Sequence, residues 1–289
     1  MTFGFWLVWL PTRKRPSDML KLASLCVLAA SVLPSIAQAQ LANPDREWTV
    51  RAGGALLYAP AFVGSDDYQL QALPYLSIEY RDIAEISYQR GLRWNVLRTE
   101  NFVAGPIARY DFGRQQDGDN LLRIAGDKSR ALRGLGDIDG SIELGGFARF
   151  RSGVFVATAE LRQAVNGHEG LVGDAGIAYD SEIDLFGLRA FLTVGPELRF
   201  TNARYAQEFF GVTPLQSFRS GLPTYRADGG VLTYGGELTL IVPLHEQVFA
   251  ALVTSYDHLA GSAGDSPLVR LRGSEDQASV GFFLAYQFD

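Results

Sequence analysis

Ser279-Val280-Gly281-Phe282-Phe283-Leu284-Ala285-Tyr286-Gln287-Phe288 alternates between two kinds of side chain near the end of the chain. One parity is apolar throughout: Val280, Phe282, Leu284, Tyr286 and Phe288. The other parity carries mostly small or polar side chains, among them Ser279, Gly281, Ala285 and Gln287. A period of two is that of a β-strand, whose successive side chains point to opposite faces. The stretch therefore predicts a strand with one oily face.

Segments of the same kind recur from Trp48 onward, and most have roughly ten residues or slightly more, with their charges on one face. Soluble strands usually have about 5 or 6 residues, whereas a strand that crosses a bilayer needs about 9 to 11. Short turns such as Ser152-Gly153 alternate with long polar connections such as residues 114–139. Aromatic residues gather at the segment ends, like the girdles of a transmembrane barrel: Tyr58, Tyr80, Trp94, Tyr110, Phe112, Phe150, Tyr179, Phe200, Tyr256 and Phe288.

These features predict an all-β fold, a closed antiparallel transmembrane β-barrel over residues 40–289. Closure follows from the solvent, because an unpaired backbone group in hydrocarbon costs several kcal/mol. Eleven alternating segments can be counted, and single-chain bacterial barrels have an even number of strands. A turn at Arg90-Gly91 would divide one segment in two and give about 12 strands. The unbroken parity of Ile86, Leu92 and Trp94 leaves 10 strands as the alternative.

Residues 1–39 are predicted to be a cleaved signal peptide, with Met19 as a possible true start. Basic residues around Lys14 precede an apolar stretch over residues 22–33, and Ala37-Gln38-Ala39 follows as a small-residue cleavage site. Cys26, the single cysteine, lies in this segment. The exported chain therefore has no thiol for a disulfide, a nucleophile or a metal.

Composition excludes several classes of protein. The 289 residues have a mean hydropathy of +0.03, and no run of about 20 apolar residues follows residue 39, which excludes a bundle of transmembrane helices. The net charge is -6 and no Lys/Arg-rich stripe is present, so no nucleic-acid partner is expected. We expect the barrel to lie in the cell outer membrane, with lipid in contact with its exterior.

Candidate chemistry is sparse. No second His or Cys stands at ligand spacing from any histidine, so no metal is expected at His168, His245 or His258. Ser255 with His258 could be imagined as a hydrolase pair, but no carboxylate is placed by the sequence to orient the base. Gly134-Leu135-Gly136 lacks the third glycine of a nucleotide site. We therefore expect neither an enzyme nor a cofactor.

Charged residues on the inward parity are the most informative set. Acidic and basic members are nearly balanced, which favours mutual ion pairs that fill the bore, because the arginine fork can satisfy several carboxylates. A selective conduit for small solutes is the alternative. The candidates for the lumen are Arg51, Glu79, Arg81, Glu85, Arg109, Asp111, Glu143, Arg149, Glu160, Arg162, Asp174, Arg189, Glu197, Arg199 and Glu237.

Two stretches of the chain are similar in sequence, and each contains a proline within a predicted strand. The stretch from Val103 to Tyr110 resembles the stretch from Thr193 to Phe200, and each contains Gly-Pro. Proline donates no hydrogen bond to a strand ladder, so both copies predict a bulge or a locally opened ladder. Coincidence between two similar strands is the alternative explanation of this similarity.

Six blocks taken together resemble the MipA/OmpV family of outer-membrane proteins, in which the MltA-interacting protein is best studied. The resemblance covers almost the whole exported chain. The blocks are Gly64-Ser65-Asp66-Asp67-Tyr68, Leu132-Arg133-Gly134-Leu135-Gly136-Asp137-Ile138-Asp139-Gly140, Gln163-Ala164-Val165-Asn166-Gly167-His168-Glu169-Gly170-Leu171, Phe210-Gly211-Val212-Thr213-Pro214, Ser220-Gly221-Leu222-Pro223 and Asp265-Ser266-Pro267-Leu268-Val269.

The resemblance implies a non-enzymatic outer-membrane barrel that serves as a scaffold. Its implied partners are a murein lytic transglycosylase and a murein synthase. Relatives in that family also suggest two alternatives, a narrow pathway for small solutes or antibiotics and a surface adhesin that acts through long extracellular loops. Scaffolding would use the periplasmic turns, near Ser152-Gly153, residues 180–184 and residues 245–247.

Overall fold

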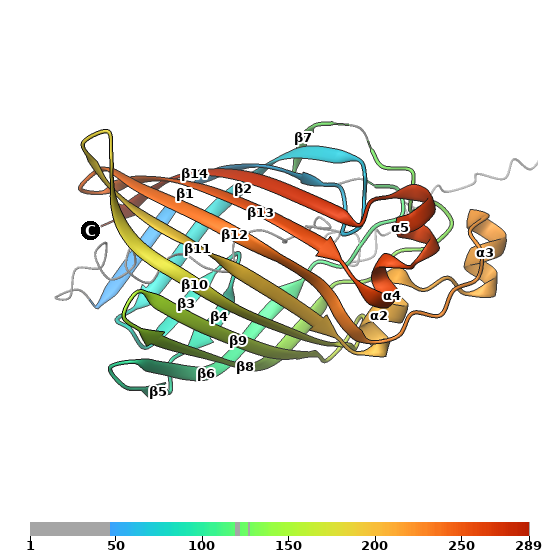
Figure 1. Ribbon diagram of the computed structural model, residues 1–289, viewed down its shortest axis with the longest axis horizontal. Helices are drawn as coiled ribbons and strands as arrows, with labels where there is room; N and C mark the ends of the chain where they lie inside the picture. Colours follow the sequence, from blue (N-terminus) through green and yellow to red (C-terminus); the bar gives the residue numbers. More distant parts are fainter. Residues whose placement is uncertain (1–46, 119–121, 127, 289) are drawn as a thin grey trace, which may run out of the picture.

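The computed structural model describes residues 47–118, 122–126 and 128–288, and the predicted leader over residues 1–39 lies outside this part. Within it the chain forms a closed antiparallel barrel with short helices gathered at one end (Figure 1). The strands are β1 (Trp48–Pro60), β2 (Tyr68–Tyr80), β3 (Ala84–Ser87), β4 (Gly91–Trp94), β5 (Leu97–Arg98), β6 (Phe102–Asp111), β7 (Arg123–Ala125), β8 (Ser141–Ser152), β9 (Phe155–Ala164), β10 (Leu171–Leu185), β11 (Leu188–Thr201), β12 (Gly230–His245), β13 (Val248–Leu259) and β14 (Asp276–Phe288). The helices are α2 (Ala203–Phe210), α3 (Pro214–Ser220), α4 (Gly261–Gly264) and α5 (Pro267–Arg272).

Twelve of the strands form the ring, in the order β1-β2-β3-β4-β6-β8-β9-β10-β11-β12-β13-β14, and β14 pairs with β1 to close it. The two remaining strands are additions: β5 follows β4 beside β6, and β7 pairs with the start of β2. Closure leaves no free edge at the seam, since β1 pairs with β14 from Val50 to Tyr58.

The twelve-strand prediction is confirmed, and the ten-strand alternative is wrong. The dividing turn comprises Tyr88 to Arg90, and Gly91 follows it with a left-handed φ of 71°. Ile86 pairs with Leu92 across this hairpin. Paired residues of two antiparallel strands point to the same face, so a turn of three residues leaves the alternation unbroken. Ile86, Leu92 and Trp94 therefore share one parity although they lie on two strands of a hairpin.

The two faces of each strand differ as the alternation predicts. In β14 the side chains of Phe282 and Phe288 are half exposed on the outside, whereas Phe283 is buried inside the barrel. Exposed aromatic residues lie in two belts, with Trp48 and Phe155 near the turn end and Tyr58 near the helix end. An apolar exterior with aromatic belts is the surface that a bilayer requires of a barrel.

The two ends of the barrel differ in the way the sequence predicts. Short turns join the strands at one end, and the helices and long connections lie at the other (Figure 1). The long connections have apolar cores of their own. One contains Phe62, Leu132, Val212 and Leu268, and a neighbouring one is built around α2. In the part of the chain that is described, no helix has both the length and the apolar character needed to span a membrane.

Both Gly-Pro sites coincide with a locally opened ladder, as predicted. Opposite Pro106 the neighbouring strand is interrupted, because β4 ends at Trp94 and β5 begins at Leu97. Opposite Pro196 the β10–β11 ladder omits two successive pairs, although the register is unchanged on either side. The missing proline N–H explains why pairing fails at these positions.

Candidate functional site in the barrel interior

Arg162 lies at the centre of a polar network on the inner faces of neighbouring strands. Its Nε donates to Glu143 Oε2 at 2.9 Å, Nη1 to Glu160 Oε2 at 2.6 Å, and Nη2 lies 2.7 Å from Asp174 Oδ2. The side chain is 3% exposed. The planar guanidinium offers five donors, so one arginine can hold three carboxylates that come from β8, β9 and β10.

Three further arginines extend this network around the wall. Arg199 Nε donates to Asp174 at 2.6 Å, and Arg109 Nη2 donates to Glu160 at 3.3 Å. Arg93 of β4 also binds Glu160. Four arginines thus share three carboxylates, and strands from β4 to β11 are joined through their inner faces. We call this set the arginine network: Arg93, Arg109, Glu143, Glu160, Arg162, Asp174 and Arg199.

Separate ion pairs lie elsewhere inside the barrel. Arg51 binds Glu79 and also donates from Nε to Gln287 Oε1 at 2.9 Å, which joins β1 to β2 and β14 beside the seam. Arg90 lies 3.3 Å from Glu85 in the β3–β4 hairpin. Near the turn end, Arg151 donates to Asp180, which also accepts from Thr193.

Thirteen of the fifteen predicted lumen residues lie on the inner side of the barrel, in three groups. Six of them belong to the arginine network, and Arg51, Glu79 and Glu85 form the separate interior pairs. Four more lie on inward positions of their strands outside the network: Asp111, Arg149, Glu197 and Glu237. Arg90 and His168 were missed, because Arg90 lies in the turn of the β3–β4 hairpin and His168 in the loop after β9, where no parity applies. Arg93 was not among the candidates, although the outward parity of Leu92 and Trp94 places it inward.

The interior placement of Arg81 and Arg189 is wrong. Arg81 lies in the β2–β3 turn with a φ of 47°, where its side chain is 52% exposed and the carboxylate of Glu47 raises its pKa. Arg189 is 66% exposed near the β10–β11 turn and pairs with Glu182. Alternation assigns a face to each residue but does not mark where a strand leaves the barrel, and both arginines lie beyond that point.

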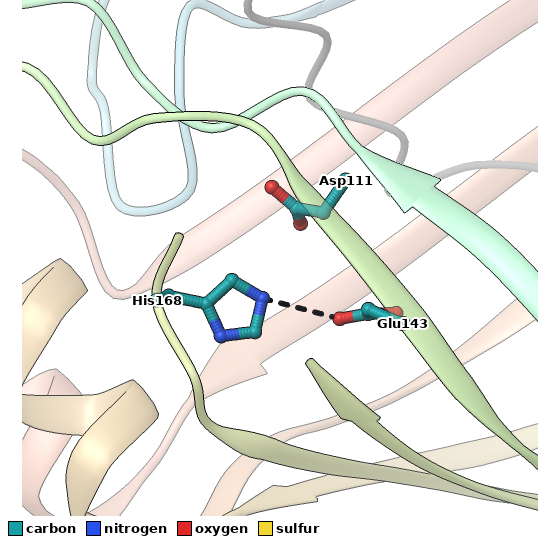
Figure 2. A group of neighbouring side chains, drawn as sticks. All are labelled: Asp111, Glu143 and His168. Atoms are coloured by element: carbon teal, nitrogen blue, oxygen red, sulfur yellow. Dashed lines mark ion pairs between the residues drawn. The ribbon is translucent and has the colours of Figure 1, made fainter. Parts of the chain in front are cut away.

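Asp111, Glu143 and His168 form a cluster between the arginine network and the long loops. Figure 2 shows the imidazole ring turned toward the Glu143 carboxylate, with Asp111 above them. His168 Nε2 lies 3.3 Å from Glu143 Oε1, and the histidine side chain is fully buried. One ligand atom from each residue lies within 4.8 Å of the others, a spacing that a metal ion could use.

The hydrogen bonds around His168 do not fit a metal. The backbone N–H of Gly170 donates to His168 Nδ1 at 3.0 Å, so Nδ1 carries the lone pair and Nε2 carries the proton. A metal at Nε2 would require the opposite tautomer, whose Nδ1–H would face the Gly170 N–H. Glu143 Oε2 is also occupied by Arg162. The Nε2–H of His168 therefore faces the Glu143 carboxylate, whose other oxygen accepts from Arg162.

Helix α2 covers this cluster from the loop side. Tyr205 and Phe209 stack with ring centroids 4.4 Å apart, and His168 contacts both rings edge-on. The side chain of Asn202 caps the helix by accepting from the Tyr205 N–H at 3.1 Å. Burial raises the pKa of the Tyr205 hydroxyl. The loops at this end are thus packed directly onto the arginine network.

The other half of the interior is apolar. Tyr75 meets Phe249 and Phe283 edge-on, each at 6.2 Å between ring centroids, within a cluster supplied by β1, β2 and β11 to β14. Two small cavities lie between these regions. One of about 90 Å³ adjoins Arg109 and Tyr205, and one of about 20 Å³ adjoins Tyr75 and Phe283. Side chains of the arginine network and of this apolar cluster occupy these two parts of the interior.

Ser255 and His258 cannot act together. Ser255 points inward, where its hydroxyl contacts that of Ser279 at 2.8 Å. His258, three residues further along β13, has the opposite parity and contacts Asp276 at 2.8 Å. The wall of the barrel separates the two side chains, so they form no nucleophile and base pair.

Comparisons with known proteins found one family and several solved structures that are similar to this chain. The family described as "MltA-interacting protein MipA" matches residues 52–288. Among solved structures, a bacterial polysaccharide outer membrane secretin is similar with a TM-score of 0.40 and 8% identity, over 85% of this chain and 100% of that chain. OmpT, an outer membrane protein of Vibrio cholerae, has a TM-score of 0.32 and 8% identity, over 83% and 96%. An anion-selective porin from Comamonas acidovorans has a TM-score of 0.29 and 11% identity, over 83% and 98%. No curated protein matches the chain.

Proposed function

The chain belongs to the MltA-interacting protein MipA family, and from this premise we propose that it is a scaffold without catalytic activity that holds murein enzymes at the outer membrane. The protein is an outer-membrane β-barrel, with a closed ring and an apolar exterior. The proposed partners are a membrane-bound murein lytic transglycosylase and a murein synthase. Because bacterial barrels place their short turns in the periplasm, these partners would meet the turn end of the barrel.

The observation that carries the proposal is a two-stranded ribbon at the turn end. The β9–β10 ladder ends at Tyr179, and the β11–β12 ladder begins at Phe191. Between these points, residues 181–190 of β10 and β11 pair only with each other in the described part of the chain. The ribbon therefore leaves the wall with unpaired backbone groups along both edges.

Unpaired strand edges are binding sites for another strand. A partner segment can add to such an edge through main-chain hydrogen bonds, while pockets or exposed side chains supply specificity. Phe186 at the ribbon tip is 98% exposed, with a φ of 55° that holds it in the tight turn with Gly187. A large exposed aromatic side chain is a frequent anchor in protein interfaces. The ribbon offers more surface than the turns at Ser152-Gly153 and His245–Gln247.

Replacing Phe186 with serine tests the proposal. We expect Phe186→Ser to weaken binding of the folded barrel to a purified membrane-bound lytic transglycosylase by roughly tenfold or more, since loss of an aromatic anchor typically costs about 2 kcal/mol. Biolayer interferometry on the detergent-solubilised barrel gives the dissociation constant. Phe218→Ser is the matched control, because Phe218 is 89% exposed at the opposite end of the barrel. Equal binding by both variants and the unchanged protein would contradict use of the ribbon.

Adhesion through the extracellular loops is a second candidate function, and α3 favours it. Leu215 and Phe218 are exposed on this helix, three residues apart and therefore on one side of it. Exposed apolar side chains beyond the membrane often mark a contact surface. Under this function we expect Phe218→Ser to reduce the number of barrel-displaying cells bound to a host-cell layer, and Phe186→Ser to leave it unchanged. Unchanged attachment of the Phe218→Ser cells would rule α3 out as the adhesive surface.

A further inference from the structure

Among the described residues, strand pairing in the barrel wall is interrupted beyond the tip of the β3–β4 hairpin. Each strand of that hairpin has four residues, whereas its neighbours β2 and β6 have thirteen and ten. The β4–β6 ladder stops at Ala108, so Arg109 to Asp111 have no strand on this side. β7 covers the start of β2, but in the described residues it pairs with β2 alone. Above the hairpin tip, no ladder formed by the described residues connects β2 or β7 to β6.

Pro74 occupies the one position of β2 whose backbone faces this opening. Ala72 N–H donates to Leu122 O at 2.8 Å on the upper side, and Leu76 O accepts from Tyr88 N–H at 3.4 Å on the lower side. Backbone groups alternate in direction along a strand, so Pro74 faces the same way between them. Proline has no N–H, so no unsatisfied donor is left toward hydrocarbon. The sequence thus accommodates the opening.

The opening lies at the level of the lipid chains. On one side, β1 presents Leu56 level with Ala72, and Leu56 is 46% exposed. On the other side, Tyr110 is level with Ile142, which is also half exposed on the exterior. The opening is nearer to the long loops than to the short turns, which places it in the outer leaflet.

The cavity of about 90 Å³ adjoins the hairpin tip and the end of β6 that border the opening. Tyr88 and Gln89 of the hairpin tip line it, as does Tyr110, which is exposed on the barrel exterior. Its inner wall includes Arg109, which is bound to Glu160 through Nη2 while its buried Nε has no acceptor. Tyr88 and Phe112 contact each other across this region with ring centroids 5.5 Å apart. Four arginines line the cavity together with the carboxylates of Asp111 and Glu143, so its charged lining is basic on balance. The cavity therefore combines aromatic walls with an unused cationic donor of Arg109.

We propose that this opening is a lateral binding site for a single-chain amphiphile with a carboxylate head. The carboxylate binds the free Nε–H of Arg109, and the alkyl chain passes between the hairpin tip and β6 into the outer leaflet. The small volume suits this arrangement, because only the head and the first methylene groups need to enter the wall. A buried arginine donor favours an anionic acceptor, and a charge-assisted hydrogen bond is stronger than a neutral one. This site is independent of the periplasmic scaffold.

A photoreactive palmitic acid with a diazirine on its chain tests the proposal. The barrel in lipid nanodiscs is irradiated with this acid, and the modified peptides are mapped by mass spectrometry. We expect adducts concentrated in residues 68–76, 86–92 and 109–113. The methyl ester of the same probe keeps the chain but loses the charge, and roughly tenfold fewer adducts are expected in these three segments. Adducts spread evenly over outward residues of all strands, or equal labelling by acid and ester, would overturn the proposal.

Variants separate the charge of Arg109 from general effects. Arg109→Gln should reduce labelling by the acid about tenfold at the same segments and leave labelling by the ester unchanged. Arg204→Gln removes an exposed arginine that pairs with Glu169 outside the barrel, and we expect full labelling by the acid. The change in gel mobility on heating reports whether each variant is folded. The comparison of acid and ester on the unchanged protein decides the question even where Arg109→Gln does not fold.

Discussion

Arg162→Met is expected to destabilise the barrel by about 3–5 kcal/mol, the usual result of removing one partner from a buried ion pair. Methionine fills part of the same volume but donates no hydrogen bond. Glu143, Glu160 and Asp174 then lose the donor they share. The urea concentration at half-unfolding, read from the change in gel mobility on heating, measures the loss in detergent micelles. The effect is large because Arg162 is 3% exposed and water cannot replace it easily.

Two further variants distinguish a network from a single contact. Arg204→Met removes an arginine whose pair with Glu169 is exposed, and such pairs contribute about 0–1 kcal/mol. Adding Asp174→Asn to Arg162→Met removes one stranded charge and should recover part of the lost stability, a coupling that a double-mutant cycle measures. If Arg162→Met is as mild as Arg204→Met, the network does not hold the barrel together.

Alternation along the strands predicted the exposed and buried faces, and the barrel with its two unlike ends followed only when segment length, aromatic segment ends and the order of short and long connections were added. The reason is physical, since lipid outside and ion pairs inside impose opposite requirements on successive residues. Val280 and Phe282 lie on the face toward the lipid, and Arg51 and Glu143 lie in the interior, as their parity predicts. The same rule fails at strand ends. Arg189 has the correct parity but lies on the ribbon beyond the wall.

The loop side of the site could not be predicted in the same way. His168 meets Asp111 and Glu143 because a loop folds back onto the mouth of the barrel, and loops have no period from which contacts follow. The short β3–β4 hairpin gave a second difficulty. Pairing of Ile86 with Leu92 preserves the alternation through the turn, so parity alone could not reveal the hairpin, although it does place Arg93 inward between Leu92 and Trp94.

No steady conductance is expected from the barrel in a planar bilayer. Two obstacles lie in series along the bore. Tyr205 and Phe209 of α2 cover the loop end, and the arginine network with the aromatic cluster around Tyr75 fills the middle. Both described cavities are small, at about 90 and 20 Å³, and a porin instead leaves an aqueous channel. Single-channel recording at high salt measures the result directly, and a porin reconstituted in parallel confirms that the membrane is responsive.

Removing the loop obstacle identifies which of the two closes the bore. A variant in which residues 203–228 are replaced by a short Gly-Ser linker loses α2 and α3 but keeps every member of the arginine network. Because Arg162 holds its three carboxylates without help from these helices, we expect this variant to remain silent as well. Stable current steps in the shortened variant alone would show that the loops close the bore. The protein would then be a gated solute pathway. Stable steps in the full chain would contradict a filled interior altogether and favour a solute pathway over a scaffold.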